Sequence, residues 1–186
     1  CILGGTGFVG SRLITPLANQ GHRITVPTRD PERARHLRIQ PSTRIIRADV
    51  QAPGTLAGLL GGCDAVINLI GILNESGRDG RGFRRAHVDL MHTLITACAG
   101  AGVSRLTQIS ALNAGAPQAT SHYLRSKGEA EALLRAAPLD WTILQPSVIY
   151  GPGDSFLDRF ARLLRLIPGA FTLPMPDTRF APLHVD

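Results

Sequence analysis

Lysine is almost absent from this chain: Lys127 is the only one, and the other nineteen of the 20 basic residues are arginine. Aromatic residues are also few, with six phenylalanines, two tyrosines and one tryptophan among 186 residues. An interior so poor in rings must consist mainly of aliphatic side chains, as in parallel sheets covered by helices. No apolar run approaches the roughly 20 residues needed to cross a bilayer, and no signal peptide is visible. We therefore expect a cytoplasmic protein.

Cysteine and histidine are too few and too scattered to indicate a disulfide framework or a metal site. Cys1, Cys63 and Cys98 are odd in number, far apart in the sequence, and form no CxxC pair. His87 and His92 are five residues apart, the wrong spacing for two ligands on one helical face. We expect reduced thiols and no bound metal.

Basic residues exceed acidic ones, which gives a net charge of +6. Such a balance raises affinity for phosphates, nucleic acids or anionic membrane surfaces. A nucleic-acid-binding protein would interleave basic with aromatic residues, whereas these arginines are scattered, so no nucleic-acid partner is expected. The densest group lies in "GRDGRGFRR", residues 77–85. This segment fits a solvated loop, a cover over a bound cofactor, or a contact with an anionic membrane at its inner face.

Short apolar runs typical of strands alternate with amphipathic helical patterns along the chain. This alternation predicts right-handed βαβ units and an α/β fold, a Rossmann-type doubly wound parallel sheet with helices on both faces. The expected strands are residues 2–3, 23–27, 43–48, 64–69, 106–110 and 141–144, and the expected helices are 8–20, 31–37, 56–60, 84–101 and 123–136. Pro16 is expected to kink or shorten the first helix.

The length of the chain suits one main core. We predict a dinucleotide-binding domain over residues 1–150, followed by the beginning of a C-terminal substrate lobe over 151–186. Both ends look cut, because "CIL" resembles the tail of a strand and "APLHVD" stops where another helix should follow. We expect a piece of a longer protein.

A glycine-rich turn, "ILGGTGFVGSRL", joins the first strand to the first helix. Gly4 permits the tight turn, Gly7 lets the backbone approach a pyrophosphate, and Gly10 lets the helix pack close to the strand. The helix N-terminus then offers free N–H groups and a partial positive charge to the phosphates. Thr6, Phe8 and Val9 complete the predicted diphosphate site.

The second strand ends in "VPTRD", beside the expected position of the adenosine ribose. Asp30 precedes Pro31 and Glu32, a pattern typical of a helix N-cap, which leaves Thr28 and Arg29 to face the ribose. A guanidinium can hold a 2′-phosphate through two hydrogen bonds. We therefore favour NADP(H) over NAD(H), the alternative being that Arg29 is merely solvated.

Two further strand ends are predicted to border the cofactor. Asp49 and Val50 follow the third strand, where they can meet the adenine, although Asp49 fits an ordinary strand-end cap equally well. Leu69 and Gly71 lie at the end of the fourth strand, where a small residue lets the chain pass the cofactor or simply makes a turn.

The only lysine lies four residues after one of the two tyrosines, in "YLRSK". On a helix, Tyr123 and Lys127 project from the same face. An ammonium near a phenol favours the phenolate, so we expect the pKa of Tyr123 to be lowered. The tyrosine would then exchange a proton with a carbonyl or alcohol during hydride transfer, while the lysine also binds the ribose hydroxyls. The alternative is a partly buried ring beside a solvated lysine.

"GGTGFVG" and "YLRSK" resemble the short-chain dehydrogenase/reductase superfamily in its extended or atypical branch, which includes the epimerases and dehydratases. "YLRSKGEAE", "LQPSVIYGPGDSFLDRFA" and "PLHVD" more narrowly resemble the NADPH-binding accessory subunit of complex I and its bacterial relatives. The likeness covers essentially the whole chain. It implies a Rossmann fold and a catalytic Tyr-x-x-x-Lys pair at Tyr123 and Lys127.

The resemblance also implies a serine or threonine that assists the tyrosine. Ser110 lies thirteen residues before Tyr123, a spacing that many single-domain members use. Extended members take this residue from beyond the strand end, where this chain has Leu112 and Asn113. Two alternatives follow: Ser110 assists the tyrosine, or Ser110 only caps the strand and Asn113 is a weaker substitute donor. Further along, "QPSVIYG" matches the segment that passes the nicotinamide, which places Pro146, Ser147 and Val148 at the cofactor and leaves Tyr150 a packing role.

Three functions follow from these residues. The first is an NADP(H)-dependent oxidoreductase or epimerase that acts on the carbonyl or hydroxyl group of an unidentified small molecule. The second is a non-catalytic NADPH-binding subunit or assembly factor of a respiratory or quinone-related complex. The third is a sensor of the NADP(H) redox ratio.

Overall fold

Strands and helices alternate along the first part of the chain, as predicted. The computed structural model describes residues 1–154, 165 and 181–186, which divide into two compact units, Cys1–Gln145 and Pro146–Asp186. The elements of the first unit are, in order, β1 (Ile2–Leu3), α1 (Phe8–Asn19), β2 (Ile24–Thr28), the 3₁₀ helix η1 (Pro31–Ile39), β3 (Thr43–Arg47), α2 (Thr55–Leu60), β4 (Ala65–Asn68), α3 (Arg81–Arg84), the π-helical turn η2 (Arg85–Asp89), α4 (Leu90–Ala101), β5 (Arg105–Ile109), α5 (His122–Ala136) and β6 (Asp140–Leu144).

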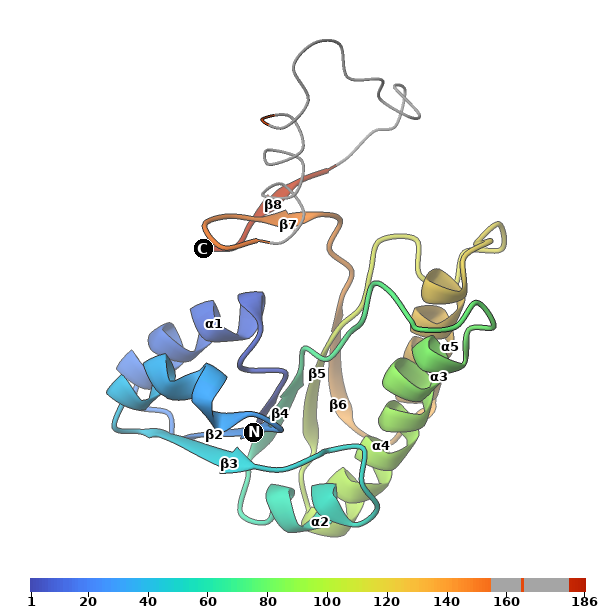
Figure 1. Cartoon of the computed structure of the whole chain (residues 1–186). Helices are drawn as coiled ribbons and strands as arrows, with labels where there is room; N and C mark the ends of the chain where they lie inside the picture. The colour runs from blue at the N-terminus through green and yellow to red at the C-terminus, as the bar shows by residue number, and fades with distance from the viewer. Residues whose placement is uncertain (155–164, 166–180) are drawn as a thin grey trace. The chain divides into compact units, whose positions relative to one another are not determined.

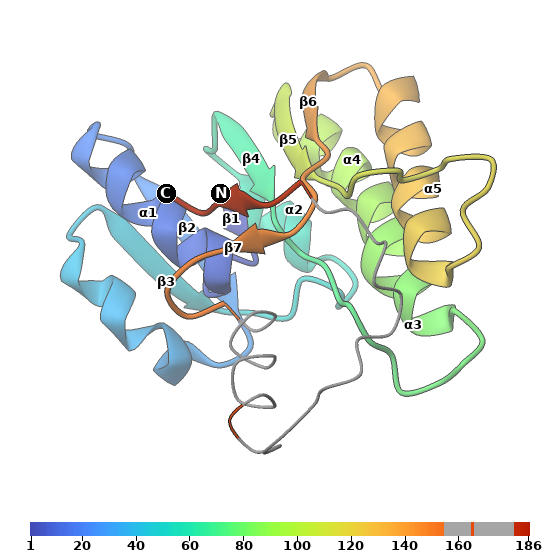
Figure 2. The same ribbon diagram turned by 90° about the horizontal axis from the view of Figure 1, so that it is seen from above.

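The strands of this unit are all parallel. Hydrogen bonds join four of them in the order β1-β4-β5-β6, and β2 and β3 form a separate pair, with β2 lying beside β1. Figures 1 and 2 show α1 on one side of these strands and the run of α3, α4 and α5 on the other. The predicted doubly wound Rossmann-type architecture is confirmed.

Two hydrophobic clusters cover the opposite faces of the sheet, because successive strand residues point to opposite sides. The adjacent residues Ile2 and Leu3 of β1 belong to different clusters. Ile2 packs with Val26 of β2 and with α1 and η1, whereas Leu3 packs with α2, α4 and α5. Because both faces of the sheet are covered, the carboxyl ends of the strands are the edge that can bind a ligand, as in other open α/β sheets.

The first helix agrees with the expectation, since α1 contains Pro16 and ends at Asn19, one residue before the predicted end. The run from α3 to α4 differs from it. Helix α3 begins at Arg81, three residues before the predicted start, because the side chain of Glu75 reaches back to its first N–H groups. The helix then passes through a π-helical turn, which the sequence pattern does not reveal.

The second unit contains β7 (Ile149–Tyr150), which pairs in parallel with β8 (Leu183–His184). The Tyr150 ring packs edge-on against His184, with 5.2 Å between centroids, in line with its expected packing role. The predicted lobe over 151–186 lies mostly outside the described residues, as does the segment "SFLDRFA" that contributed to the resemblance.

Candidate cofactor site

The glycine turn has the geometry that a phosphate loop requires. Gly4 has a φ of +75°, and a β-carbon there would lie 3.1 Å from the backbone of Leu69 and Ile70. At Gly10 a β-carbon would lie 2.5 Å from the α-carbon of Gly5, so only glycine allows α1 to pack this close to the strand. Helix α1 begins after Gly7 with no side-chain cap and no acidic residue in its first turn. Its N–H groups are therefore available to an anion, and the residues present fit a dinucleotide diphosphate.

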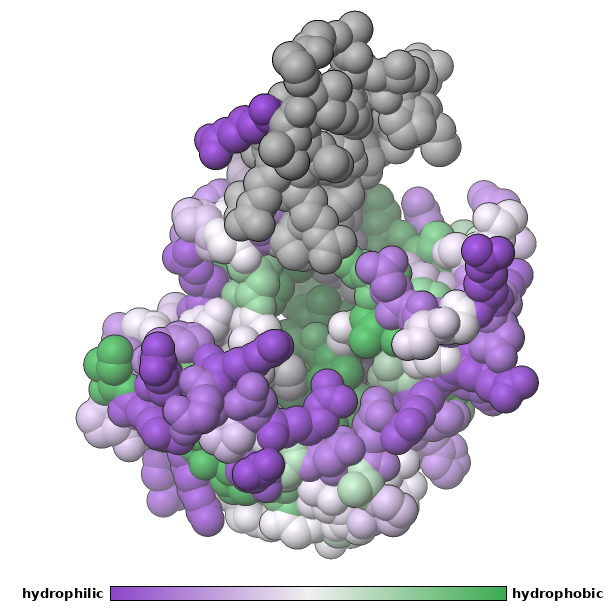
Figure 3. All heavy atoms as spheres, in the orientation of Figure 1, coloured by the Kyte–Doolittle hydropathy of each residue, from purple (hydrophilic) through white to green (hydrophobic). Residues whose placement is uncertain are grey.

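A cavity of about 1000 Å³ opens in front of this turn. In the space-filling view, the surface is hollowed between the α1 side and the α3–α5 side, with hydrophobic residues inside and hydrophilic ones around (Figure 3). The size is at the upper end of the range for small-molecule and cofactor sites. Of the predicted residues, its wall contains Gly4, Thr6, Gly7, Thr28, Arg29, Asp49, Val50, Leu69 and Gly71, whereas the helical residues Phe8, Val9 and Gly10 lie outside that wall.

The end of β2 carries the predicted ribose contacts. Asp30 caps η1 by accepting the N–H of Glu32 at 3.1 Å, as the sequence indicated. The Thr28 hydroxyl oxygen accepts the N–H of Asp30 at 3.2 Å. Arg33 pairs with Asp30 at 3.4 Å, whereas Arg29 forms no ion pair within the described part of the chain and borders the cavity. Arg29 is therefore the guanidinium free to meet a phosphate at this end.

The position of Asp49 is compatible with both roles that the sequence left open, and its contact with the adenine remains a prediction. Its carboxylate accepts the N–H of Gln51 at 3.0 Å, which is an ordinary turn interaction, and the residue also borders the cavity.

The only lysine is buried rather than solvated. Lys127 lies on α5 and is 4% exposed, and its ammonium donates to the carbonyl of Ile109 at 3.1 Å. Burial lowers the pKa of Lys127 to about 8, and the nearby Glu131 partly opposes that shift.

The expectation for the tyrosine was wrong. Burial raises the pKa of Tyr123 instead of lowering it, because the phenolate would lose its hydration. The ring packs edge-on against Phe83 and His87, with centroids 5.9 and 5.7 Å away. The phenol is therefore protonated at neutral pH, and the catalytic role of Tyr123 remains a prediction.

Gly71 connects the cavity to the Tyr123–Lys127 pair, which does not itself form part of the cavity wall. Gly71 borders the cavity, and a β-carbon at this position would lie 3.2 Å from the Lys127 ammonium and 3.8 Å from Nε2 of His87. The glycine therefore lets the wall of the cavity approach the buried lysine.

Ser110 is left without a hydrogen-bond partner for its side chain. Its hydroxyl is buried and unbonded among the described residues, while its N–H donates to the carbonyl of Leu144. Asn113 has a φ of 64° and lies in a turn. A buried hydroxyl without a partner is costly unless a ligand or water meets it. The structure brings neither residue into hydrogen bonding with Tyr123, so their assisting roles remain predictions.

Pro146, Ser147 and Val148 belong to the second unit. There the Ser147 hydroxyl accepts the N–H of Ala181 at 3.4 Å. Their contact with the cofactor remains a prediction.

Sequence reasoning missed several buried polar residues around the site. Asn68 of β4 donates to Gln108 of β5 at 2.7 Å, and Gln108 donates to the same Ile109 carbonyl that Lys127 binds. The His87 ring lies between α5 and the cavity wall. The only signal for the amide pair was a polar residue in each of two apolar strands, and His87 had none.

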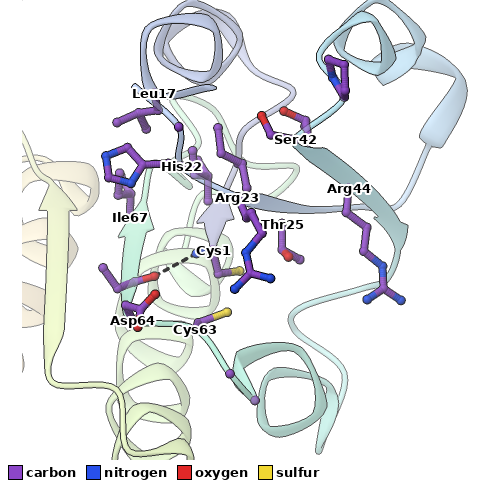
Figure 4. A pocket seen from close by; sticks show the side chains of 18 residues that line it. Cys1, Leu17, His22, Arg23, Thr25, Ser42, Arg44, Cys63, Asp64 and Ile67 are labelled. Carbon is purple, nitrogen blue, oxygen red and sulfur yellow. Dashed lines mark hydrogen bonds between the residues drawn. The ribbon is translucent and has the colours of Figure 1, made fainter. Parts of the chain in front are cut away.

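A second cavity, of about 710 Å³, opens among the amino ends of β1 to β4 (Figure 4). Its wall includes Cys1, Cys63, Arg23 and Asp64, and the Cys1 amino group donates to the carbonyl of Ala65 at 2.8 Å. Its glycines, Gly21, Gly61 and Gly62, follow the C-terminal ends of α1 and α2, so none of them leads from a strand end into a helix N-terminus as a dinucleotide site requires. Among the described residues, no cluster of three or more histidine, cysteine or acidic side chains is placed to hold a metal, and no helix is long and apolar enough to span a membrane.

Comparison with known proteins agrees with this geometry. A family described as NAD(P)H-binding matches residues 4–155. The chain is 32% identical to the ceramide reductase of Caulobacter vibrioides, over all of this chain and 56% of that protein. It is 30% identical to the mouse NADH dehydrogenase [ubiquinone] 1 alpha subcomplex subunit 9, over 86% of this chain and 43% of that protein.

Among solved structures, MoeE5 in complex with UDP-glucuronic acid and NAD superposes with a TM-score of 0.79 and 28% identity. That match covers 99% of this chain and 67% of MoeE5. The chain thus spans about half the length of the curated relatives it matches.

Proposed function

This chain belongs to the NAD(P)H-binding family, within the extended short-chain dehydrogenases/reductases, and on that basis we propose that it is an NADP(H)-dependent oxidoreductase or epimerase. Its substrate would carry a carbonyl or hydroxyl group. The relatives and structural neighbours include a ceramide reductase and a protein bound to a sugar nucleotide, so the compound itself stays open.

The observation that carries the proposal is the continuity from the glycine turn to the buried lysine. The free N–H groups of α1 would hold the diphosphate, and Arg29 would hold a 2′-phosphate. Gly71 brings the other end of the cavity within reach of Lys127, whose ammonium would bind the ribose hydroxyls.

The bound nicotinamide would supply or accept a hydride. Tyr123, whose pKa burial raises, would donate a proton to the substrate oxygen in the direction of reduction. The buried hydroxyl of Ser110 would donate a hydrogen bond to the same oxygen. Lys127 would stabilise the phenolate that forms when the proton leaves.

Nucleotide titration tests the cofactor assignment. We expect the protein to bind NADPH more tightly than NADH. Arg29→Ala should weaken NADPH binding about tenfold by removing a charge-assisted contact, and leave NADH binding unchanged. The control is Arg35→Ala, which removes an exposed arginine of the following helix η1 that does not border the cavity. A clear preference for NADH in the unchanged protein would refute the assignment.

The second candidate function is an NADPH-binding subunit or assembly factor that docks on a respiratory or quinone-related complex, peripherally at a membrane surface. A turnover assay separates this candidate from the enzyme. That candidate is favoured by Leu112, an exposed leucine at the position where extended members carry their assisting residue. Incubating the NADPH complex with quinones, aldehydes, long-chain ketones and sugar nucleotides should oxidise the cofactor in at least one case. Bound cofactor that stays reduced throughout would favour the subunit.

A further inference from the structure

His87 is a buried histidine that the proposed chemistry does not use. It is 4% exposed and lies in η2, between the buried residues Ala86 and Val88. Single π-helical turns within α-helices occur frequently at functional sites. A hydrophobic side chain would fill this position without any need for hydrogen bonds, so the imidazole calls for a specific reason.

Both ring nitrogens are bonded, and the two bonds require the same tautomer. The Ile72 N–H donates to Nε2 at 3.3 Å, so Nε2 carries no proton. The Ser126 hydroxyl donates its proton to the carbonyl of Tyr123 at 2.8 Å, so it accepts from Nδ1–H of His87, also at 2.8 Å. The ring is therefore neutral and protonated on Nδ1.

These bonds join the two halves of the site. Ile72 borders the cavity, whereas Ser126 lies on α5 between Tyr123 and Lys127. The imidazole also packs edge-on against the Tyr123 ring. It thus bridges the wall of the cavity and the helix that carries the tyrosine and lysine.

We propose that His87 is a positioning residue of the cofactor site, whose neutral ring fixes the wall segment Gly71–Ile72 against α5 and so sets the distance from the cavity to Lys127 and Tyr123. This inference rests on the proposed cofactor function. His87 does not line the cavity, and it acts through its hydrogen bonds to Ile72 and Ser126.

Three substitutions separate the two bonds. In His87→Asn the side-chain amide can replace Nδ1 but does not extend to Ile72. In His87→Gln the amide oxygen can replace Nε2 as acceptor for the Ile72 N–H. His87→Leu removes both bonds and keeps the bulk. His92→Gln, at an exposed histidine of α4, is the matched control.

We expect NADPH affinity, measured by fluorescence titration, to fall about tenfold in His87→Leu and His87→Asn, since the partly buried Ile72 N–H loses its acceptor and the wall segment is no longer held. His87→Gln should remain within about threefold of the unchanged protein, because it restores that acceptor. If His87→Gln binds as weakly as His87→Leu, or if all three bind like the unchanged protein, the proposal is overturned.

Nitrogen NMR of the unchanged protein gives a second test, which stands even if a variant does not fold. The His87 ring should be neutral with its proton on Nδ1, and NADPH should shift both the Ile72 amide and Nε2. A proton on Nε2, or an Nε2 signal indifferent to bound NADPH, would overturn the inference. Failure of the unchanged protein to bind NADPH would overturn the proposed function together with it, whereas binding that ignores His87 would overturn this inference alone.

Discussion

At the scale of single residues, the site depends on a buried cation. Lys127 is the only lysine in the chain, and its ammonium donates a hydrogen bond to the carbonyl of Ile109. Since burial lowers its pKa to about 8, the charge that would bind the ribose is lost just above neutral pH.

The first prediction is that NADPH affinity weakens as the pH rises from 7 to 9.5. Above its pKa the Lys127 amine is neutral and loses its charge-assisted contacts, which should weaken binding about tenfold. Fluorescence titration at several pH values measures the effect. Lys127→Met should bind weakly at every pH in this range. If the NADPH affinity of Lys127→Met still fell as the pH rose, a group other than Lys127 would be responsible and the prediction would be contradicted.

The second prediction concerns His87 and acid. Burial, with a smaller effect of Lys127, lowers the pKa of His87 from 6.5 to about 3. Between these values the unfolded chain binds more protons than the folded one, so the free energy of unfolding falls as the pH falls. The loss from this residue at pH 5 should be about 2 kcal/mol.

Urea unfolding at pH 7 and pH 5 measures that loss. In His87→Gln the side chain at position 87 no longer titrates, so the drop should be smaller by the same amount. Equal drops in both proteins would contradict the shifted pKa.

At the scale of elements, the close approach of β1 and α1 creates the phosphate loop. Gly10→Ala should abolish NADPH binding and destabilise the fold, because the added β-carbon meets the α-carbon of Gly5 at 2.5 Å. Gly100→Ala is the control, since that position in α4 has open space around it and alanine favours a helix by about 1 kcal/mol. Thermal melting and nucleotide titration of both variants check the contrast.

The side-chain carboxylate of Glu75 caps the N-terminus of the helical run from α3 to α4. Glu75 accepts the N–H groups of Gly80 and Gly82 at 2.8 Å and of Phe83 at 3.3 Å. Glu75→Ala should therefore lower the free energy of unfolding by about 1–2 kcal/mol, as loss of a helix cap does. Glu129→Ala breaks only an exposed ion pair with Arg84 and should cost less than about 1 kcal/mol. Urea unfolding in which the two variants lose equally would refute the capping role.

At the scale of the whole molecule, two of the cavities among the described residues lie at opposite ends of the strands of the first unit, and of these two the one at the carboxyl ends borders the Gly4–Gly10 turn. NADPH at 100 times its dissociation constant should raise the free energy of unfolding by about 2.7 kcal/mol, because the nucleotide binds the folded chain alone. A melting temperature that does not move with NADPH, while other nucleotides raise it, would reassign the cavity. The predicted domain boundary at residue 150 and the cytoplasmic or peripheral location remain predictions at this scale.

The sequence alone determined what depends on short spacing. The alternation of strands and helices specifies the Rossmann fold, and the spacing of Gly4, Gly7 and Gly10 specifies its phosphate loop. Both patterns are local, because each lies within one turn or one βαβ unit. The shared face of Tyr123 and Lys127 follows from four residues of helical pitch.

Tertiary structure decided the electrostatics of that pair. Lys127 donates to a carbonyl 18 residues away in the sequence, and His87 bonds to a serine 39 residues away. No local sequence pattern predicts either contact. The pKa of Tyr123 was predicted in the wrong direction for the same reason. Spacing places two groups on one face, but only the packing of distant strands and helices sets how much water each group keeps, and hydration fixes which protonation state is stable.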